Sequence, residues 1–389
     1  MDSLEANFTI LPATASKPPV SRAGHAGPPP PFSQMAGAKA GMVTLSQLVG
    51  FDEVIDVRSP AEFAEDHIPG AINCPVLDDE ERARVGTLYK QVSAFDAKKI
   101  GAALVARNIA RHIEQHFMPQ PKGWKPLIYC WRGGSRSAAM AYILRQIGWN
   151  AGQLDGGYRA YRRQVITDLA ILPERFTFRV VCGATGSGKS RLLQALKTVH
   201  AQVLDLEELA AHRGSVLGSL PGQPQPSQKM FDSLVCAELS RFDPAQPVFV
   251  EAESKKIGLL RVPDALIARM WVSGCIHLEM QHDARIQLLA EEYAHFLAAP
   301  HTLHAKLDLL VGLHSRERIA HWKVLADGGA WNQLVDELLT EHYDPAYRRS
   351  TLKHYSSLGQ AIALSARDGS PGSMARLAAE LLMYPSSPQ

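Results

Sequence analysis

The hydrophobic positions of the chain predict short strands separated by helices. Residues 51–58 are predicted to form a strand that ends in charged residues, and the apolar run at residues 126–129 predicts a second strand. The spacing of Ala139, Ile143 and Ile147 predicts a helix directly after the second strand. Alternating strands and helices are typical of a parallel sheet covered by helices on both faces. We therefore predict a parallel α/β domain at residues 41–172.

The same pattern starts again further along and then stops. Apolar runs at residues 178–183, 202–206 and 247–251 predict a second α/β domain at residues 173–282. Beyond residue 283 the apolar positions recur only at helical spacing, so residues 283–389 are predicted to be a helical C-terminal region. The predicted fold class is α/β with two successive domains followed by helices.

The N-terminal segment differs from the rest in composition. Residues 1–40 are rich in Pro, Ala, Gly and Ser, and include the run Pro28-Pro29-Pro30-Pro31. Such a segment buries too little apolar surface to offset its ordering entropy, so we expect a disordered tail. In the whole chain of 389 residues the net charge is only +2, so any nucleic-acid contact must come from local basic patches.

Cysteine usage and hydropathy indicate the compartment. The five cysteines include no CxxC pair, which argues against a zinc site or a disulfide framework. No apolar run has the length needed to cross a membrane, and the N-terminus lacks the order of a signal peptide. We expect a cytoplasmic protein with no membrane contact.

The first candidate site is a loop that contains a cysteine. Cys130 follows the strand at residues 126–129 and precedes the helix that contains Ala139. A helix N-terminus and nearby cations favour the thiolate form of a cysteine, and adjacent glycines let successive backbone N–H groups point inward. We expect Cys130 to be a nucleophile that acts on an anion held by the rest of the loop, which is Arg132, Gly133, Gly134, Ser135 and Arg136.

This first domain resembles the rhodanese superfamily. The resemblance lies in Ile55-Asp56-Val57-Arg58-Ser59-Pro60, in His67-Ile68-Pro69-Gly70-Ala71, in the loop from Cys130 to Ser137 and in Gly156-Gly157-Tyr158. It implies that Cys130 carries a persulfide or a selenosulfide. The loop is one residue longer than in many single-domain rhodaneses, and its Cys-x5-Arg spacing is also that of rhodanese-fold phosphatases. It should therefore accept an anion larger than the terminal sulfur of thiosulfate. Those phosphatases usually have His where this chain has Tyr129, which weakens a phosphatase interpretation.

The second candidate site is a phosphate loop that satisfies G-x4-G-K-[ST] between a predicted strand and a predicted helix. Lys189 would neutralise phosphate oxygens, and Ser190 would bind Mg²⁺ if the ion is present. The motif does not distinguish a nucleotide from another diphosphate. Its predicted binding residues are Gly183, Thr185, Gly186, Ser187, Gly188, Lys189 and Ser190.

Taken whole, the chain resembles the tRNA 2-selenouridine synthase family over residues 43–360. Beyond the two loops, the resemblance lies in residues 81–91, in 206–215, in 251–258 and in His342-Tyr343-Asp344-Pro345-Ala346-Tyr347. It implies that a geranyl group passes from geranyl diphosphate to the sulfur of wobble 2-thiouridine, and that selenium from selenophosphate then replaces the S-geranyl group. It also implies tRNA as a partner, an enzyme that supplies selenophosphate as a further candidate partner, and no tightly bound cofactor.

A tRNA substrate needs basic surface despite the small net charge. The candidate tRNA or anion contacts are Arg162, Arg163, His212, Arg213, Arg348 and Arg349. Aromatic residues interleave with the arginines in two of these patches, which would suit an unstacked anticodon base. Each of these two patches can equally be a solvated helix face, whereas His212 and Arg213 are the stronger candidates because they lie in a block on which the family resemblance rests.

Three other functions remain open on the sequence. A kinase or NTPase with a regulatory rhodanese domain would turn over ATP. A plain sulfurtransferase or phosphatase would need only residues 1–172 and would not need Lys189. A scaffold protein would leave both loops without a purpose.

Overall fold

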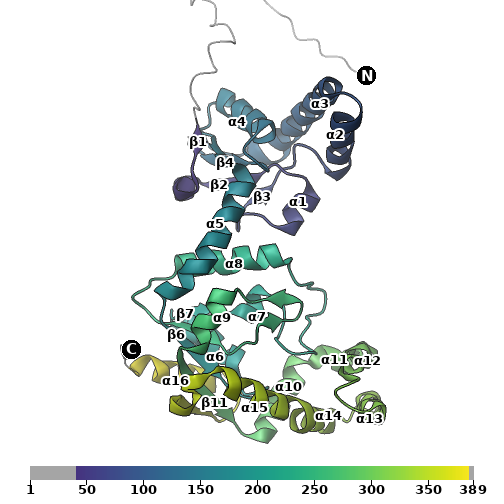
Figure 1. Ribbon diagram of the computed structural model, residues 1–389, viewed down its shortest axis with the longest axis vertical. Coiled ribbons are helices and arrows are strands. Elements are labelled where there is room, and N and C mark those ends of the chain that lie inside the picture. The colour runs from purple at the N-terminus through teal and green to yellow at the C-terminus, as the bar shows by residue number, and fades with distance from the viewer. Residues whose placement is uncertain (1–40, 385–389) are drawn as a thin grey trace, which may run out of the picture. The chain divides into compact units, whose positions relative to one another are not determined.

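The computed structural model describes residues 41–384. The Pro-rich segment that we predict to be disordered, residues 1–40, lies outside the described residues, as do residues 385–389. The described chain contains two five-stranded sheets in which every neighbouring pair of strands is parallel (Figure 1). The predicted α/β class is confirmed.

The first sheet lies in the rhodanese-like region. Its elements are β1 (Met42–Val43), β2 (Glu53–Asp56), α1 (Pro60–Glu65), β3 (Ile72–Asn73), α2 (Asp79–Gln91), α3 (Ala94–His112), β4 (Pro126–Tyr129), α4 (Ser135–Ile147), β5 (Gly152–Leu154) and α5 (Gly157–Ile171). The strand order is β1-β5-β4-β2-β3. Ile55 on β2 pairs with Ile128 on β4, and both side chains are fully buried. β4 thus lies at the centre of the sheet and delivers Cys130 at its carboxyl end.

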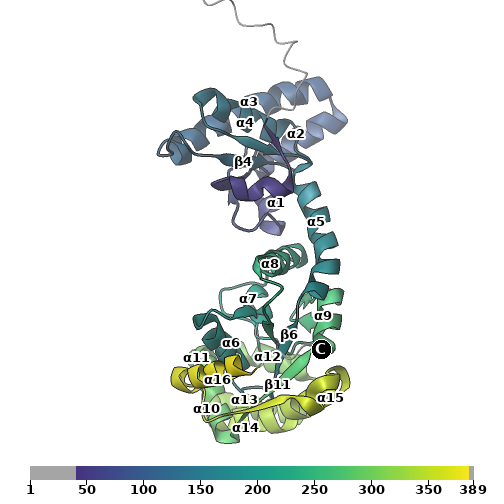
Figure 2. The same ribbon diagram turned by 90° about the vertical axis from the view of Figure 1, so that its left-hand side faces the viewer.

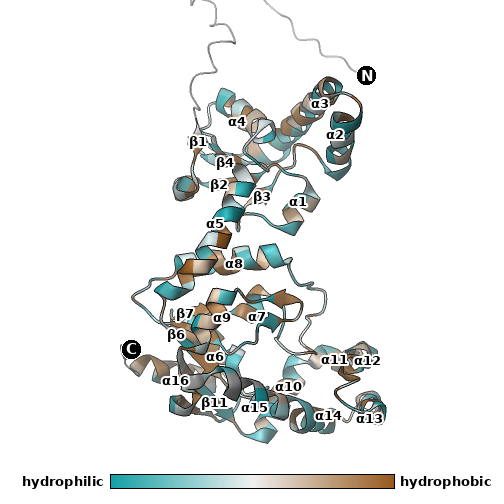
Figure 3. Ribbon diagram, viewed as in Figure 1, coloured by the Kyte–Doolittle hydropathy of each residue, from teal (hydrophilic) through white to brown (hydrophobic). Residues whose placement is uncertain are grey.

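The second sheet carries the phosphate loop. Its elements are β6 (Phe178–Cys182), α6 (Lys189–Thr198), β7 (Gln202–Leu204), α7 (Leu206–Leu209), α8 (Gln228–Arg241), β8 (Val248–Glu251), α9 (Asp264–Trp271), β11 (Gly274–Met280), β12 (Ile362–Ala366) and α16 (Pro371–Met383), with a short hairpin of β9 (Lys256–Ile257) and β10 (Leu260–Arg261). The strand order is β12-β11-β6-β8-β7, so β6 is central. Apolar residues gather on β6, β7 and α9 (Figure 3).

Two strands of this sheet were not among the predicted ones. β11 pairs with both β6 and β12, and β12 completes the edge of the sheet. The expectation that strands end near residue 283 was therefore wrong. β12 alternates larger and small residues, Ile362-Ala363-Leu364-Ser365-Ala366, and buries fully only Leu364 and Ala366. An edge strand this short has a weak apolar signal.

α16 covers the same part of the sheet as α6. Leu192 and Leu196 of α6 and Leu377 and Leu381 of α16 belong to one buried cluster. Figures 1 and 2 both show α16 beside α6. The C-terminal segment therefore buttresses the helix that follows the phosphate loop.

Between β11 and β12 the chain is helical, as predicted. Its helices are α10 (His282–Glu292), α11 (Ala294–Ala298), α12 (Pro300–Leu307), α13 (Arg316–Asp327), α14 (Trp331–Leu338) and α15 (Asp344–His354). Their core is built around Trp322, which is fully buried together with Leu307 and Leu310. No helix among residues 41–384 is long and apolar enough to cross a membrane.

Candidate functional site

The Cys130 thiol is held by donors from its own loop. Cys130 is 3% exposed, and its Sγ accepts hydrogen bonds from the Gly134 N–H and the Ser137 hydroxyl, each at 3.2 Å. Donors aimed at sulfur stabilise the thiolate relative to the thiol. Gln153 on β5 donates to the Gly133 carbonyl at 2.8 Å and to the Ser137 hydroxyl at 3.0 Å, which fixes the loop.

Two glycines make this loop geometrically possible. Gly133 has φ +65°, and a Cβ there would lie 2.6 Å from the Leu154 carbonyl oxygen. Gly157 has φ +56°, and its Cβ would lie 2.2 Å from the Cys130 carbonyl oxygen. Any side chain at either position would open the loop.

The cations of the loop are not equally available. Arg136 donates to Glu62 at 3.0 Å, whereas Arg132 is exposed. Burial raises the pKa of Glu62, but the Arg136 hydrogen bond and charge outweigh it and leave that pKa lowered. The pair is therefore ionised at neutral pH. An anion in the loop would meet an Arg136 side chain that Glu62 already positions.

Tyr129 does not take the place of a catalytic histidine. Its side chain is fully buried, and its hydroxyl accepts a hydrogen bond from the Ile68 N–H at 3.2 Å. Burial raises its pKa well above the ordinary value, so the phenol stays protonated. Tyr129 is a packing residue beneath the loop.

The phosphate loop has the backbone that its motif requires. Gly186 and Gly188 have φ +77° and +89°. A Cβ on Gly183 would lie 2.5 Å from the Ser187 Oγ and 2.6 Å from the Leu278 carbonyl oxygen. The Lys189 Nζ donates to the Gly183 carbonyl at 3.0 Å, which places the ammonium over the loop. The predicted binding residues are thus brought together at the carboxyl end of β6 and the N-terminus of α6.

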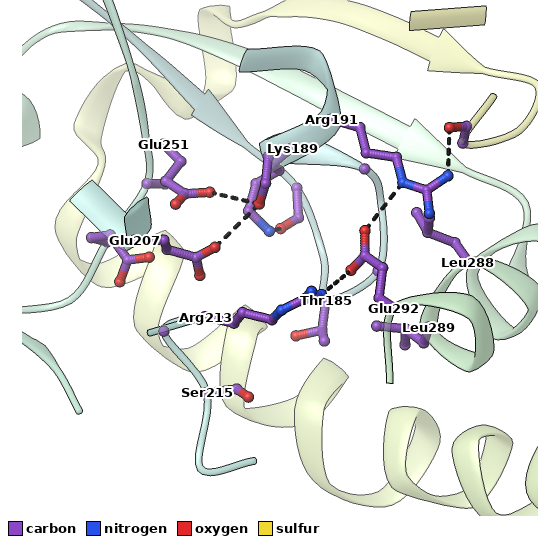
Figure 4. A pocket seen from close by; sticks show the side chains of 18 of the residues that line it. Thr185, Lys189, Arg191, Glu207, Arg213, Ser215, Glu251, Leu288, Leu289 and Glu292 are labelled. Atoms are coloured by element: carbon purple, nitrogen blue, oxygen red, sulfur yellow. Dashed lines mark hydrogen bonds and ion pairs between the residues drawn. The ribbon is translucent and has the colours of Figure 1, made fainter. Parts of the chain in front are cut away.

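Three glutamates converge beside Ser190. One carboxylate oxygen from each of Glu207, Glu251 and Glu253 lies within 4.8 Å of the others, and the Ser190 hydroxyl donates to Glu207 at 3.1 Å. Figure 4 shows Glu207 and Glu251 side by side near Lys189. Burial, followed by the charges of its neighbours, raises the pKa of Glu251 well above the ordinary value. The same causes raise the pKa of Glu253 to about 8.

This group fits a divalent cation. Glu251 is 1% exposed, and its Oε1 is buried without a hydrogen-bond partner. A hard cation such as Mg²⁺ prefers carboxylate and hydroxyl oxygens, and it would relieve the repulsion among the glutamates. Ser190, Glu207 and Glu251 are the residues that would hold it.

A buried arginine fastens the phosphate loop to the C-terminal helices. Arg285 on α10 donates to the Thr185 carbonyl at 2.9 Å, and its guanidinium binds both carboxylate oxygens of Asp344 at 3.1 and 2.6 Å. Asp344 begins α15 and belongs to the block at residues 342–347 on which the family resemblance partly rests. Residues 342–347 therefore have a structural role, because Asp344 holds the arginine that contacts the phosphate loop.

The loop opens into a cavity of about 980 Å³. Glu207 and Glu251 line one side of it, and Leu288 and Leu289 of α10 lie on the other (Figure 4). Arg213 binds Glu292 at 3.1 Å in the same wall. His212 also lines the cavity; burial lowers its pKa, so it is neutral at pH 7.

The other proposed tRNA contacts lie in different surroundings. Arg162 is largely buried and donates to Asp232 at 2.5 Å and to the Lys229 carbonyl at 2.9 Å, both on α8. This pairing holds α5 against α8 and occupies most of the Arg162 guanidinium, so few of its N–H groups can contact a ligand. Arg163, Arg348 and Arg349 are exposed.

Comparisons with known proteins match both halves of the chain. A family model described as a rhodanese-like domain matches residues 42–164, and one described as the tRNA 2-selenouridine synthase AAA domain matches residues 176–311. A tRNA 2-selenouridine synthase of Hydrogenovibrio crunogenus is 33% identical over 330 residues, covering 76% of this chain and 88% of the relative. The chain belongs to the tRNA 2-selenouridine synthase family. The match to the synthase of Alcanivorax borkumensis is 36% identical over 255 residues, 64% of this chain and 68% of the relative.

Other members of the family match over a smaller share. The synthase of Nitrosomonas europaea is 36% identical over 247 residues, which are 62% of this chain and 63% of the relative. The matched region thus spans less than two thirds of that relative.

Several functional residues were not predicted from the sequence. Ser137 and Gln153 position Cys130 and its loop, and Arg285 positions Thr185. Ser137 could have been found as the residue directly after Arg136 in the loop. Gln153 and Arg285 carry no local signal, because their partners are distant in the sequence.

Proposed function

We propose that this protein converts wobble 2-thiouridine of tRNA to 2-selenouridine through an S-geranyl intermediate, with geranyl diphosphate and selenophosphate as substrates. The observation that carries the proposal is the presence of two complete anion-binding loops in one chain of this family, only one of which contains a nucleophile. One loop suits departure of a diphosphate, and the other suits transfer of a phosphorylated selenium.

The first step takes place at the phosphate loop. The sulfur of 2-thiouridine attacks C1 of geranyl diphosphate, the C–O bond breaks, and pyrophosphate leaves with the electron pair. Backbone N–H groups of residues 183–188 and the Lys189 ammonium stabilise the charge that develops on the phosphate oxygens. Mg²⁺ held by Ser190, Glu207 and Glu251 would neutralise further charge on the diphosphate.

The second step takes place at Cys130. The selenium of selenophosphate attacks C2 of the S-geranyl uridine, and geranyl thiolate leaves. The Cys130 thiolate then attacks phosphorus and breaks the Se–P bond, which releases 2-selenouridine and leaves a phosphorylated cysteine for water to hydrolyse. This route needs no external reductant, whereas release of selenide from a selenosulfide does. The Cys-x5-Arg spacing and the donors to Sγ support it.

The tRNA would be held by exposed basic residues. Arg163, Arg348 and Arg349 are exposed and remain candidates, and Arg213 and His212 line the phosphate-loop cavity. An enzyme that makes selenophosphate is the expected supplier of the second substrate, because selenophosphate is a reactive compound.

The test is mass spectrometry of nucleosides from 2-thiouridine tRNA incubated with geranyl diphosphate and selenophosphate. We expect 2-selenouridine with the wild type and only S-geranyl-2-thiouridine with Cys130→Ala, since removing a nucleophile costs on the order of 10³-fold or more. Lys189→Ala should lower geranyl transfer by roughly 10²-fold or more.

Two matched variants control for general damage. Cys74→Ala removes another buried thiol, whose pKa burial raises to about 12, and Lys99→Ala removes a surface ammonium paired with Asp96. Both should retain wild-type product levels. Unchanged 2-thiouridine in every sample would refute the proposal.

A kinase or NTPase function is the second candidate, because a phosphate loop with Ser190 and a buried Glu251 also suits a nucleotide bound with Mg²⁺. The same samples supplied with ATP test it. ATP turnover that depends on Lys189, without any change in the nucleosides, would favour that function.

A further inference from the structure

A second, apolar cavity lies behind the phosphate loop. It has a volume of about 60 Å³ and is enclosed mainly by α10, α14 and the segments that flank them. Its walls include Phe296, Leu303, Leu334, Val335 and Leu338. None of its wall residues is charged.

This cavity adjoins the larger one at the loop. Thr185, Leu289, Tyr293 and Tyr343 line both cavities. Thr185 is itself a member of the phosphate loop, and Figure 4 shows it beside Leu289 and Glu292. Burial raises the pKa of the Tyr293 and Tyr343 phenols, so neither places a charge between the two cavities. A ligand whose phosphates occupy the loop can therefore extend a hydrocarbon tail past Thr185.

We propose that the apolar cavity is the binding subsite for the terminal isoprene unit of an allylic diphosphate whose diphosphate lies in the phosphate loop. This inference rests on the proposed function and adds the residues that select the length of the transferred chain. Its walls are mostly hydrocarbon, and only Thr185, Tyr293, Trp331 and Tyr343 carry a hydrogen-bonding group, so they suit an isoprene unit better than a nucleoside base or a ribose.

The volume of the cavity sets the preferred length. A single water needs roughly 10–15 Å³ of such space, so 60 Å³ holds about four to six small groups, the size of one five-carbon unit. A ten-carbon chain would place its first unit in the large cavity and its second unit here. A five-carbon chain would leave the cavity empty, and a fifteen-carbon chain would exceed it.

The competing explanation is a packing gap without a ligand. The same helices contribute to the buried cluster around Trp322, and a small void in a helical core is common. The two explanations differ in what happens to chain-length selectivity when the cavity is filled.

The experiment measures binding of inorganic pyrophosphate and of dimethylallyl, geranyl and farnesyl diphosphate by calorimetry. The wild type should bind geranyl diphosphate at least about tenfold more tightly than dimethylallyl diphosphate, because five more carbons leave water. Val335→Phe fills the cavity and should reduce that ratio to about threefold or less, with pyrophosphate affinity unchanged. Val324→Phe, at a position that is 66% exposed on α13, is the matched control and should keep the wild-type ratio.

A second variant guards against misfolding of the first. Val335→Ala enlarges the cavity and should raise the affinity for farnesyl relative to geranyl diphosphate by roughly threefold or more. Equal affinities for all chain lengths in the wild type, or an unchanged ratio in both Val335 variants, would overturn the inference. Geranyl transfer to tRNA together with unchanged ratios would leave the proposed function standing. Length-selective binding without any transfer would support the subsite and count against the proposed function.

Discussion

The cysteine loop and the phosphate loop, which we propose bind anions, have opposite arrangements of charge. Around Cys130 the donors already point at the sulfur, and Arg136 is already paired with Glu62. Around Lys189 three carboxylates lie close together, and two of them have strongly raised pKa values. The first loop is prepared for its chemistry by its own hydrogen bonds. The second has excess negative charge next to a site for a negative ligand, which makes sense only if a cation or protons accompany that ligand.

Removing Arg285 is expected to have the largest effect on this comparison. Arg285 links the phosphate loop to α15 through the Thr185 carbonyl and a two-point ion pair with Asp344, whereas the cysteine loop is linked to α1 by the single Arg136–Glu62 pair. Arg285→Ala leaves the partly exposed Asp344 without its partner and should lower the free energy of unfolding by about 2–4 kcal/mol. It should also weaken pyrophosphate binding, because the Thr185 carbonyl loses its donor. Chemical denaturation and calorimetry measure the two effects.

The control for this prediction is the double variant Arg285→Ala with Asp344→Asn, which removes both charges. It should recover part of the lost stability but not the loss in pyrophosphate affinity. If Arg285→Ala binds pyrophosphate with wild-type affinity, Arg285 does not position the phosphate loop.

The acidic group predicts an intermediate effect that depends on pH. The pKa of Glu253 is about 8 in the folded protein against 4.5 as its ordinary value. Between these values the folded state binds more protons than the unfolded state, so the free energy of unfolding falls as pH rises from 5 to 8.5. In EDTA, the decrease in the free energy of unfolding between pH 5 and 8.5 should be smaller in Glu253→Gln than in the wild type by about 1–3 kcal/mol.

Denaturation curves at several pH values measure this difference, with Glu80→Gln, an exposed residue of α2, as the control. Mg²⁺ should restore stability to the wild type above pH 8 and have less effect at pH 6. A pH dependence that is the same in wild type and Glu253→Gln would contradict the repulsion that we describe.

Ser137 should give the smallest effect. Ser137→Ala removes one of two donors to the Cys130 Sγ, and a hydrogen bond of this kind contributes about 0.5–1.5 kcal/mol. The rate of selenium incorporation should fall roughly three- to tenfold, with geranyl transfer unchanged. Ser46→Ala, an exposed position in the same domain, is the control. An unchanged rate of selenium incorporation would mean that the Ser137 hydroxyl does not assist Cys130.

Sequence reasoning succeeded where the chemistry is local. The residues of each loop are consecutive, and the strands before them, β4 and β6, are continuous apolar runs, so both loops were located from sequence. The sequence indicates only part of the acidic group. Glu251 and Glu253 are near neighbours in the sequence, but Glu207 joins them only because β7 and β8 are neighbours in the sheet.

The parts that could not be predicted depend on contacts between distant segments. β11 places His277 and Glu279 between its apolar residues, which interrupts its apolar signal. β12 is short and consists partly of small side chains, so its strand signal is weak. Arg285 is a single cation on an amphipathic helix, and nothing in its neighbourhood indicates that it is buried against Asp344.

The late position of β12 has a consequence for how the chain is made. The rhodanese-like sheet is complete once residue 154 has left the ribosome, whereas the sheet around the phosphate loop waits for residues 362–366. Until then β11 can pair only with β6, so the backbone donors and acceptors on its other edge are exposed, the kind of surface on which nascent chains aggregate. During synthesis the first sheet therefore has all of its strands well before the second, and one edge of β11 stays without its partner strand over that whole interval.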